Sequence, residues 1–438
     1  MASESDWKEA SLGDFVELKR GYDLPKAKRS AGNVPIISSA GVSDFHSIAM
    51  VKGPGVITGR YGTIGEVFYV DEDYWPLNTT LYVRDFKGND PRFISYFLKT
   101  LDFDSYSDKG AVPGVNRNHL HLAKVRIPKV ETQKTIANFL NRLDSKTNLN
   151  QQINQTLEAM AQAVFKSWFI DFDPVKAKIT AIAEGSDPLR AAMGAISGKT
   201  DAELDALPPE HYEQLAATAA IFPEEMEDSE WGEVPMGWAC GALGDVCSFT
   251  AGSAFKPEHQ GSSDGDYPFI KVSDMNLAGN EVFIQSANNY VSKDQQSEMK
   301  AKLHPPGATI FAKIGVALTS NRRRLLTTPT IIDNNLMSAN PVDEKSGRYF
   351  LYSMLNMIDF NTLVSGTALP YINVSDLKKI PIVRPPHEVV LAFETKMSST
   401  FTMIQTLAAQ SSTLATTRNI LLPKLLSGEV EVSGMLGS

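Results

Sequence analysis

Hydrophobic and polar residues follow two different rhythms along this chain, and each rhythm occurs twice. Short runs of β-branched and aromatic residues, separated by Gly, Pro, Asn and Asp, fill residues 7–128 and again residues 237–384. Such runs predict short β-strands joined by turns. In the first region the expected strands are "VPIISSAG", "GVITG", "GEVFYV" and "TTLYV". An amphipathic helix is expected near 92–101 and another near 349–357, so each region is predicted to be an α+β module with a curved sheet.

The second rhythm is helical and follows each module. Between residues 131 and 170 the following residues recur at alternating spacings of four and three: Ile136, Leu140, Leu143, Thr147, Asn150, Asn154, Leu157, Ala161, Val164 and Trp168. This spacing predicts a seam that packs against another helix, and the two mid-seam asparagines are expected to fix its register. A second long helix is predicted over 388–426, with Pro423 as a kink or terminator and Gly428 as its end.

Three pairs of segments align the two modules. "LGDFVELKRG" (12–21) matches "LGDVCSFTAG" (243–252), "PGVITGRYG" (54–62) matches "PGATIFAKIG" (306–315), and "GAVPGVNRNHLHLAKVRIP" (110–128) matches "GTALPYINVSDLKKIPI" (366–382). A repeat this long indicates a duplicated domain. We expect two tandem-related modules separated by a pair of long antiparallel, coiled-coil-like helices in a pseudo-two-fold arrangement. The predicted boundaries are 1–130 for the first module, 131–182 for the region of the first long helix, 183–236 for an insertion, 237–385 for the second module and 386–438 for the second long helix and tail.

Composition and charge narrow the class of protein. No long apolar run or signal peptide is present, so a cytoplasmic protein is expected. Cys240 and Cys247 are expected to be buried thiols on or beside one strand. The net charge is −9, but residues 201–233 contain 11 acidic and no basic side chains, and without them it becomes −9 + 11 = +2. Any DNA-binding surface must therefore be local. The acidic insertion is expected to be either a folded strap or a mobile segment.

The sequence lacks the motifs of common catalytic sites. It has no P-loop, GxGxxG turn, CxxC pair, HExxH helix or GxSxG elbow. His119 and His121 have no third ligand nearby, and we expect a partly exposed pair. Asp171 and Asp173 are expected to end a helix next to Pro174 and not to hold a metal. This pattern favours a binding protein with no bound cofactor over an enzyme.

Basic residues on matching loops point to DNA. "TGRYGTIG" (58–65) puts Arg60, Tyr61 and Thr63 among glycines, where a phosphate backbone can approach closely. Its counterpart "FAKIGVALTSNRRRLL" (311–326) carries Lys313 and three adjacent arginines, Arg322, Arg323 and Arg324. Three adjacent arginines on a loop or hairpin suit phosphate clamping, and one or more could read guanine edges. A solvated charged turn is the alternative.

A second pair of loops offers side chains for reading bases. "DKGAVPGVNRN" (108–118) contains Lys109, Asn116 and Arg117, and residues 365–373 of the other module end in Asn373. Asn and Arg suit adenine and guanine edges. A structural Gly-Pro loop explains the same residues equally well. An early basic run has no full counterpart in the second module and serves either the first module alone or solvation: Lys19, Arg20, Lys26, Lys28 and Arg29.

Three phrases resemble a known family. "FKSWFIDFDPV" (165–175), "LPPEHYEQLAATAAIFPEEMEDSEWGEVPMGW" (207–238) and "LLPKLLSGEVEV" (421–432) are similar to segments of the specificity subunits of type I restriction–modification systems. The resemblance extends over the whole chain. It implies that each module is a target recognition domain for one half of a bipartite, asymmetric DNA sequence with a fixed gap. The chain itself is then non-catalytic.

The resemblance also implies partners. Two methyltransferase subunits with S-adenosylmethionine would methylate adenine N6, and two motor–nuclease subunits with ATP and magnesium would add cleavage. Six apolar residues on the long helices are candidate contacts with the methyltransferase subunit: Phe165, Trp168, Phe169, Phe172, Leu421 and Leu425. For the four aromatic residues, packing against the second long helix is an equal alternative. Membrane binding is not expected.

Two other functions compete with this interpretation. The first is an adaptor that bridges proteins or binds DNA without sequence preference, which would show weak salt dependence. The second is a fused adenine methyltransferase. The nearest phrase to its catalytic motif, "NPV" at Asn340, lacks the second proline and the aromatic residue.

Overall fold

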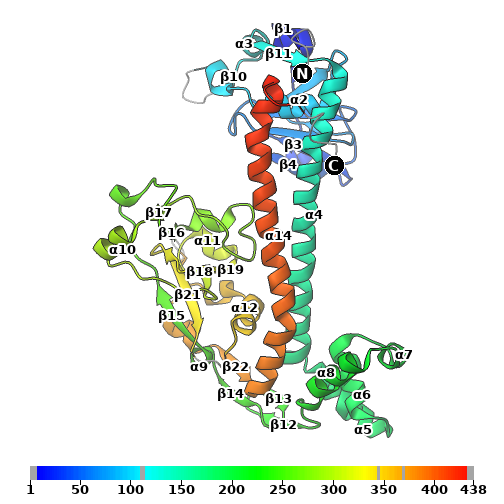
Figure 1. The fold of residues 1–438 in the computed structure, drawn as a ribbon, viewed down its shortest axis with the longest axis vertical. Coiled ribbons are helices and arrows are strands. Elements are labelled where there is room, and N and C mark those ends of the chain that lie inside the picture. Colours follow the sequence, from blue (N-terminus) through cyan, green and yellow to red (C-terminus); the bar gives the residue numbers. More distant parts are fainter. Residues whose placement is uncertain (1–6, 109–113, 343–345, 367–369, 432–438) are drawn as a thin grey trace. The chain divides into compact units, whose positions relative to one another are not determined.

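The computed structural model describes residues 7–108, 114–342, 346–366 and 370–431, and its chain forms two compact units (Figure 1). The first unit consists of Met1–Thr147 and Thr413–Ser438, and the second of Asn148–Ser412. In the described ranges no helix is both long enough and apolar enough to cross a membrane.

The first unit contains the first module, which is built from three main sheets and one short two-stranded pair. The largest has the strand order β2-β8-β5-β6, a second has the order β4-β3-β7, and β1 pairs with β11. The strands are β1 (Trp7–Ser11), β2 (Glu17–Arg20), β3 (Val34–Ser38), β4 (Gly41–His46), β5 (Gly55–Gly59), β6 (Val67–Val70), β7 (Trp75–Pro76), β8 (Thr80–Asp85), β9 (Ser107–Asp108), β10 (Gly114–Val115) and β11 (Lys124–Pro128). The helices are α1 (Leu12–Phe15), α2 (Pro91–Leu98) and α3 (Arg117–His121), with 3₁₀ turns η2 (Lys26–Lys28) and η3 (Phe103–Tyr106).

The second unit repeats this topology in the second module. Its largest sheet has the order β15-β21-β18-β19, the next has β17-β16-β20, and β14 pairs with β22. The strands are β14 (Ala239–Ala242), β15 (Cys247–Ala251), β16 (Tyr267–Ile270), β17 (Tyr290–Val291), β18 (Thr309–Ala312), β19 (Arg323–Leu325), β20 (Ile331–Ile332), β21 (Leu336–Pro341) and β22 (Pro381–Arg384). The helices are α9 (Leu243–Val246), α10 (Lys293–Met299), α11 (Val316–Thr319), α12 (Arg348–Met357) and α13 (Val374–Lys378), with 3₁₀ turns η4 (Pro257–His259), η5 (Val272–Asn276) and η6 (Phe360–Leu363). Because all three sheets correspond strand by strand, the predicted duplication is confirmed.

The two long helices are α4 (Val130–Phe169) and α14 (His387–Ser427), each within two residues of its predicted ends. All ten predicted seam residues of α4 are buried or half-buried, because their spacing keeps them on one face of the helix. Pro423 lies inside α14 and does not end it. The helix ends just before Gly428, which has a φ of 79° that glycine adopts without strain.

The antiparallel packing of α4 and α14 is seen inside each unit. In the second unit Asn150 Nδ2 donates to Gln410 Oε1 at 2.8 Å, and Asn154 Nδ2 donates to the carbonyl oxygen of Ile404 at 3.1 Å. A later residue on α4 thus meets an earlier one on α14. The two mid-seam asparagines pair across the seam as a register-fixing role requires.

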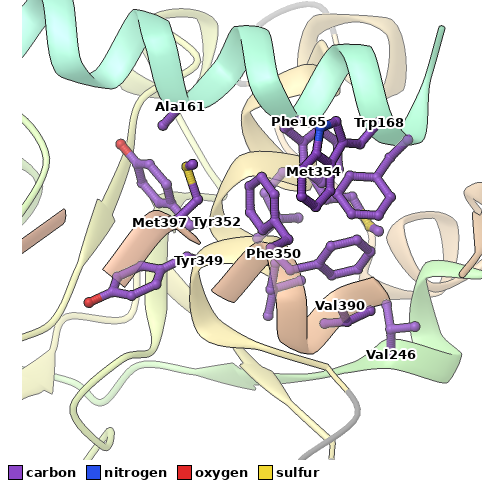
Figure 2. Packing of buried hydrophobic residues seen from close by; sticks show 14 of the residues in the cluster. Ala161, Phe165, Trp168, Val246, Tyr349, Phe350, Tyr352, Met354, Val390 and Met397 are labelled. Atoms are coloured by element: carbon purple, nitrogen blue, oxygen red, sulfur yellow. The ribbon is translucent and has the colours of Figure 1, made fainter. Parts of the chain in front are cut away.

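Aromatic residues at the end of α4 form the core of the second unit (Figure 2). Phe165 lies 5.5 Å from Phe350 of α12 and 5.7 Å from Phe393 of α14, measured between ring centroids. Trp168 packs edge-on against Phe222 at 5.2 Å and Phe393 at 6.0 Å. Phe169 and Phe172 are also buried, beside Trp238. The assignment of these four aromatic residues to a partner surface is therefore wrong. Packing against the second long helix is confirmed for Phe165, Trp168 and Phe169, which contact Phe393, whereas Phe172 packs against Trp238.

The end of α14 belongs to the core of the first unit. Leu425 is fully buried among residues of the first module, and Leu421 packs half-buried against the same cluster. The indole of Trp7 lies against Gly428, where an added Cβ would come within 2.9 Å of the ring. Leu425 is therefore unavailable to a partner, and the apolar pattern at this end of the helix is explained by packing within the chain.

The acidic insertion is a folded segment. Helix α5 (Asp173–Glu184) leads into it, and it contains α6 (Pro188–Ser197), α7 (Asp201–Asp205), α8 (Pro209–Ala220) and the hairpin β12 (Met226–Ser229)–β13 (Gly232–Pro235). Its helices have local start signals, including Pro188 after the capping Asp187. Arg190 bridges to Asp201 and Asp205, both at 2.7 Å. Of the two alternatives, the folded one is correct.

The cysteines were expected on or beside one strand, but they lie on two. Cys240 is on β14 and Cys247 is on β15, and α9 separates the two strands. Both are free thiols. Cys247 is buried, and desolvation raises the pKa of its thiol to about 12, so it stays protonated at neutral pH.

Candidate nucleic-acid interface

In the first module three loops meet where β3, β5 and β7 end. β3 and β7 run parallel, and the N–H of Leu77 donates to the carbonyl oxygen of Ile37 at 2.9 Å. The turn after β7 is bonded in turn to the loop after β5, because the N–H of Arg60 donates a hydrogen bond to the carbonyl oxygen of Thr79 at 2.9 Å. An added Cβ on Gly59 would lie 3.3 Å from Ser39, so the turn after β3 also touches this loop. The residues that follow the three strands therefore form one surface.

Arg60 and Tyr61 stand on this surface as a pair. The Arg60 guanidinium lies 4.5 Å from the Tyr61 ring centroid, a cation–π distance. The Tyr61 ring covers Gly114, where an added Cβ would come within 2.2 Å of it, so only glycine fits beneath. Arg20 is exposed, and its Nε donates to the carbonyl oxygen of Asn78 at 3.3 Å in the turn after β7. Arg20 and Arg60 thus both contact the turn after β7, and a pair of arginines at one turn is suited to phosphate binding.

The second module builds the same surface from corresponding residues. The N–H of Lys313 donates to the carbonyl oxygen of Asn335 at 2.9 Å, and the N–H of Ile372 donates to that of Lys313 at 3.0 Å. These bonds match the bond from Arg60 to Thr79 and the 2.9 Å bond from Val115 to Arg60. The predicted match of Arg60 with Lys313 is therefore confirmed by the backbone.

The aromatic residue of this surface differs between the modules. Tyr61 bridges to Gly114 in the first module, and Ile314 bridges to Tyr371 in the second. The ring is thus supplied by the first strand in one module and by the opposite strand in the other. Tyr61 and Tyr371 are both exposed, at 36% and 41%. An exposed ring next to a basic side chain is suited to contact with a base or sugar.

The three adjacent arginines were expected on a loop or hairpin, and two of them lie on β19, which pairs antiparallel with β18. Arg323 and Arg324 lie on β19, and Arg323 is only 2% exposed. Arg323 donates to the carbonyl oxygens of Asn321 and Ile358, and its guanidinium lies 3.9 Å from the Phe360 ring centroid. Burial lowers its pKa to about 10, which still leaves it charged at neutral pH.

Arg324 also turns inward. It is half-buried and donates to the carbonyl oxygen of Met275 at 3.3 Å. The Arg322 side chain is exposed and forms no ion pair or hydrogen bond within the described residues, so of the three arginines it alone is available to a phosphate. The prediction that Arg323 contacts DNA is therefore wrong, because its side chain is buried.

The matched asparagines each begin a helix. Asn116 precedes α3, and its Oδ1 accepts from the N–H of Asn118 at 3.0 Å. Asn373 precedes α13, and its Nδ2 donates to Asp376 Oδ2 at 3.1 Å. Asn is favoured at such N-cap positions. The Asn116 side chain caps α3, whereas the Asn373 side chain forms no capping bond to the backbone of α13. Base contact by either asparagine stays a prediction.

The remaining predicted DNA contacts are placed as follows. Arg117 and Thr63 are exposed on the first module. Lys109 lies outside the described residues. Contact of these residues with DNA is not tested by their positions and stays a prediction.

The residues considered for metal binding have structural roles. His121 Nε2 accepts from the N–H of Leu18 at 2.9 Å, and burial lowers the pKa of His121, which keeps the ring neutral. Asp171 pairs with Lys166 just after α4, and Asp173 is the first residue of α5. Among the described residues, no group of three or more His, Cys, Asp or Glu side chains is arranged to hold a metal ion.

Several surface residues were missed by the sequence reasoning. Asn78 and Asn334 occupy corresponding turns after β7 and β20, and Asn334 is exposed. Asn276 and Val316 flank the Lys313 loop. The paired phrases "LNTT" and "DNNL" could have revealed the turns. Nothing in the sequence indicated that the 3₁₀ turn after β16 would reach the helix after β18.

Comparison with known proteins identifies the family. The model for the type I restriction modification DNA specificity domain matches residues 4–159 and 235–402. The chain belongs to this family. It is 32% identical to the HindI specificity subunit of Haemophilus influenzae, over 97% of this chain and 100% of that protein. It is 24% identical to the MjaIX specificity subunit of Methanocaldococcus jannaschii, over 98% of this chain and 94% of that protein.

The fold of this specificity subunit agrees with a solved one. A crystal structure of the S subunit from M. genitalium matches with a TM-score of 0.52, at 13% identity, over 97% of both chains. At that identity the likeness concerns the fold alone. The two family matches cover the two modules described above, so the modules of this DNA specificity subunit are its two specificity domains.

Proposed function

We propose that this specificity subunit reads a split, asymmetric DNA target, with one module on each half. The observation that carries the proposal is the corresponding surface after the matched strands, centred on Arg60 in one module and Lys313 in the other. The backbone is shared, but the exposed side chains differ: Arg20 corresponds to Ala251, and Tyr61 to Ile314. Equal scaffolds with unequal side chains favour two different half-sites.

The charge of each surface supports contact with the phosphate backbone. Among the described residues, no acidic side chain forms an ion pair with Arg60, Lys313 or Arg322. Cations without an internal partner are available to DNA phosphates, and their release of counterions makes binding salt-dependent. Side chains beside them can then read base edges.

The same proposal assigns the chemistry to other subunits. Two methyltransferase subunits with S-adenosylmethionine would methylate adenine N6, and two motor–nuclease subunits with ATP and magnesium would cleave unmodified DNA. Specificity subunits are non-catalytic components of such systems, and this chain would hold the target while a partner flips the base. The seam of α4 and α14, with paired Asn150 and Gln410, supports a fixed gap between the halves.

A genome-wide map of N6-methyladenine tests the proposal. Cells would express this chain with its neighbouring methyltransferase subunit, and a strain lacking only this chain would serve as control. Loss of one split, asymmetric motif with a constant gap on deletion is expected. An unchanged map, with both proteins shown to be expressed and associated, would contradict the proposal and favour a sequence-independent adaptor.

A further inference from the structure

A small cavity opens beside the Lys313 loop in the second module. Its volume is about 200 Å³. The lining residues come from η5, from the end of β18 and from the segment that contains α11: Val272, Met275, Asn276, Ala312, Val316, Ala317, Ser320 and Arg322. The lining is mostly apolar, with one amide, one guanidinium and the Ser320 hydroxyl, which donates to the carbonyl oxygen of Ala317.

The loop geometry holds this cavity open. Gly315 has a φ of 83° and precedes α11, so the chain turns sharply after the Lys313 loop. This turn leaves Val316 82% exposed, more than any other large hydrophobic side chain in the described structure. Covering such an exposed valine with an apolar group is favourable, because it removes apolar surface from water.

The polar residues of the cavity are available for a ligand. Asn276 and Arg322 are exposed, and neither side chain forms a hydrogen bond or ion pair within the described part of the chain. Arg324, two residues further on, is instead tied to the carbonyl oxygen of Met275 in the wall. The cavity therefore offers apolar contact, hydrogen bonding and positive charge together, with Lys313 on the neighbouring loop. This combination complements a base edge and its phosphate.

From these contacts we propose that the cavity receives the 5-methyl group of a thymine in the half-site read by the second module. Thymine alone among the four bases of unmodified DNA presents a methyl group in the major groove. Val316, Ala312 and Ala317 contact the methyl group, and Arg322 binds a neighbouring phosphate. This inference rests on the proposed function, because it names a base within the proposed target.

The first module does not share this arrangement. At the corresponding place, Ser39 of the turn after β3 lies against Gly59 and Gly62, where its Oγ is 3.3 Å from the position of an added Gly62 Cβ. The structure has a hydroxyl group there instead of an apolar wall. Recognition of the thymine methyl group is therefore assigned to the second module.

Replacement of thymine by deoxyuridine tests the proposal, because it removes only the methyl group. Duplexes carrying the methylated target would have each thymine replaced singly, and binding by the complete complex with the methyltransferase subunit would be measured. Wild type is expected to lose roughly fourfold in affinity at one thymine, the change expected for one buried methyl-sized group. Val316→Ser should bind both duplexes equally at that position.

A matched control separates the cavity from general surface effects. Leu122 is exposed to 70% on the first module, so Leu122→Ser removes a similar apolar surface and should keep the full difference between thymine and deoxyuridine. The proposal is overturned if no thymine distinguishes the two duplexes, or if Val316→Ser keeps the difference. A chain with no specific target at all would instead contradict the proposed function.

Discussion

The two modules share a backbone but use it differently. Their sheets have corresponding strand orders, and the bond that fixes Arg60 in one fixes Lys313 in the other. Where a residue type is the same, as at Asn116 and Asn373, it begins a helix. Where the residue type differs, as at Tyr61 and Ile314, the side chain is exposed or half-buried at the candidate DNA-binding surface. Within this chain, identity between repeats therefore marks structure, and difference marks candidate specificity.

The modules can also be compared in their side-chain contacts with the long helices. In the first unit, Tyr96 of α2 donates to Asp144 of α4 at 2.6 Å, and Arg418 of α14 pairs with the same carboxylate at 2.6 Å. In the second unit, rings of α4, α12 and α14 interlock, and Tyr352 donates to Glu158 at 2.5 Å. Both units thus have a tyrosine–carboxylate bond beside an apolar core, and the core at the helices is mixed aliphatic and aromatic in the first unit and mainly aromatic in the second.

The largest expected effect concerns the aromatic core. Trp168→Ala should lower the free energy of unfolding of the second unit by about 3–5 kcal/mol, because it leaves a large cavity among packed rings. Chemical unfolding of the isolated chain measures this. Met160→Ala is the matched control on the same helix, since Met160 is 58% exposed and should change stability by less than about 0.5 kcal/mol. Similar small losses of stability for both variants would contradict the burial of Trp168 within the chain and favour its contact with a partner subunit.

The second prediction separates neighbouring arginines. Arg323→Ala should cost about 3 kcal/mol of stability, because it removes a buried side chain and leaves two carbonyl oxygens without their donor. Arg322→Ala should leave the unfolding free energy unchanged and weaken DNA binding. Unfolding and DNA titration of both variants check this. A loss of DNA affinity in Arg323→Ala without a loss of stability contradicts the inward placement.

Much of the fold could be predicted from the sequence, because spacing decides which face of an element is buried. The seam of α4 was found for this reason, although Phe165 and its aromatic neighbours were partly assigned to a partner. A run of apolar residues shows that a face is covered but not which surface covers it. The same limit applies to Arg323, since a basic run shows charge and not the strand alternation that turns one side chain inward.

A pH effect distinguishes the modules next. His304 is buried in the second module, its Nδ1 lies 2.7 Å from Ser338 Oγ, and burial lowers its pKa to about 4. As the pH falls from about 6.5 towards 4, the unfolded chain takes up a proton that the folded chain does not. The second unit should therefore lose up to about 2–3 kcal/mol of stability over this range.

The control for this effect is a histidine outside the core. His304→Gln should flatten the pH dependence of the unfolding free energy between pH 4 and 6.5, whereas His211→Gln, at an exposed position of α8, should keep it. Unfolding curves at several pH values measure the slope. An unchanged slope in His304→Gln would show that another group carries the dependence.

The smallest expected effect concerns the matched cations. Arg60→Ala and Lys313→Ala should each weaken binding to the target by about 1 kcal/mol and each reduce the salt slope of log K by about one. Lys124→Ala, at an exposed position of β11, is the control and should change neither. Titrations at several salt concentrations check this. If only one of the two variants changed the slope, the equivalence of the two surfaces would not extend to DNA binding.

The central claim is that each module reads its own half of one target. The most direct measurement is a methylation map made with a chimaera, in which residues 239–384 are replaced by the corresponding module of the Haemophilus influenzae relative, while α4 and α14 are kept. One half of the methylated motif should change, and the other half and the gap should stay the same. A motif that changes in both halves, or in neither half although the chimaera still directs methylation, would contradict the account.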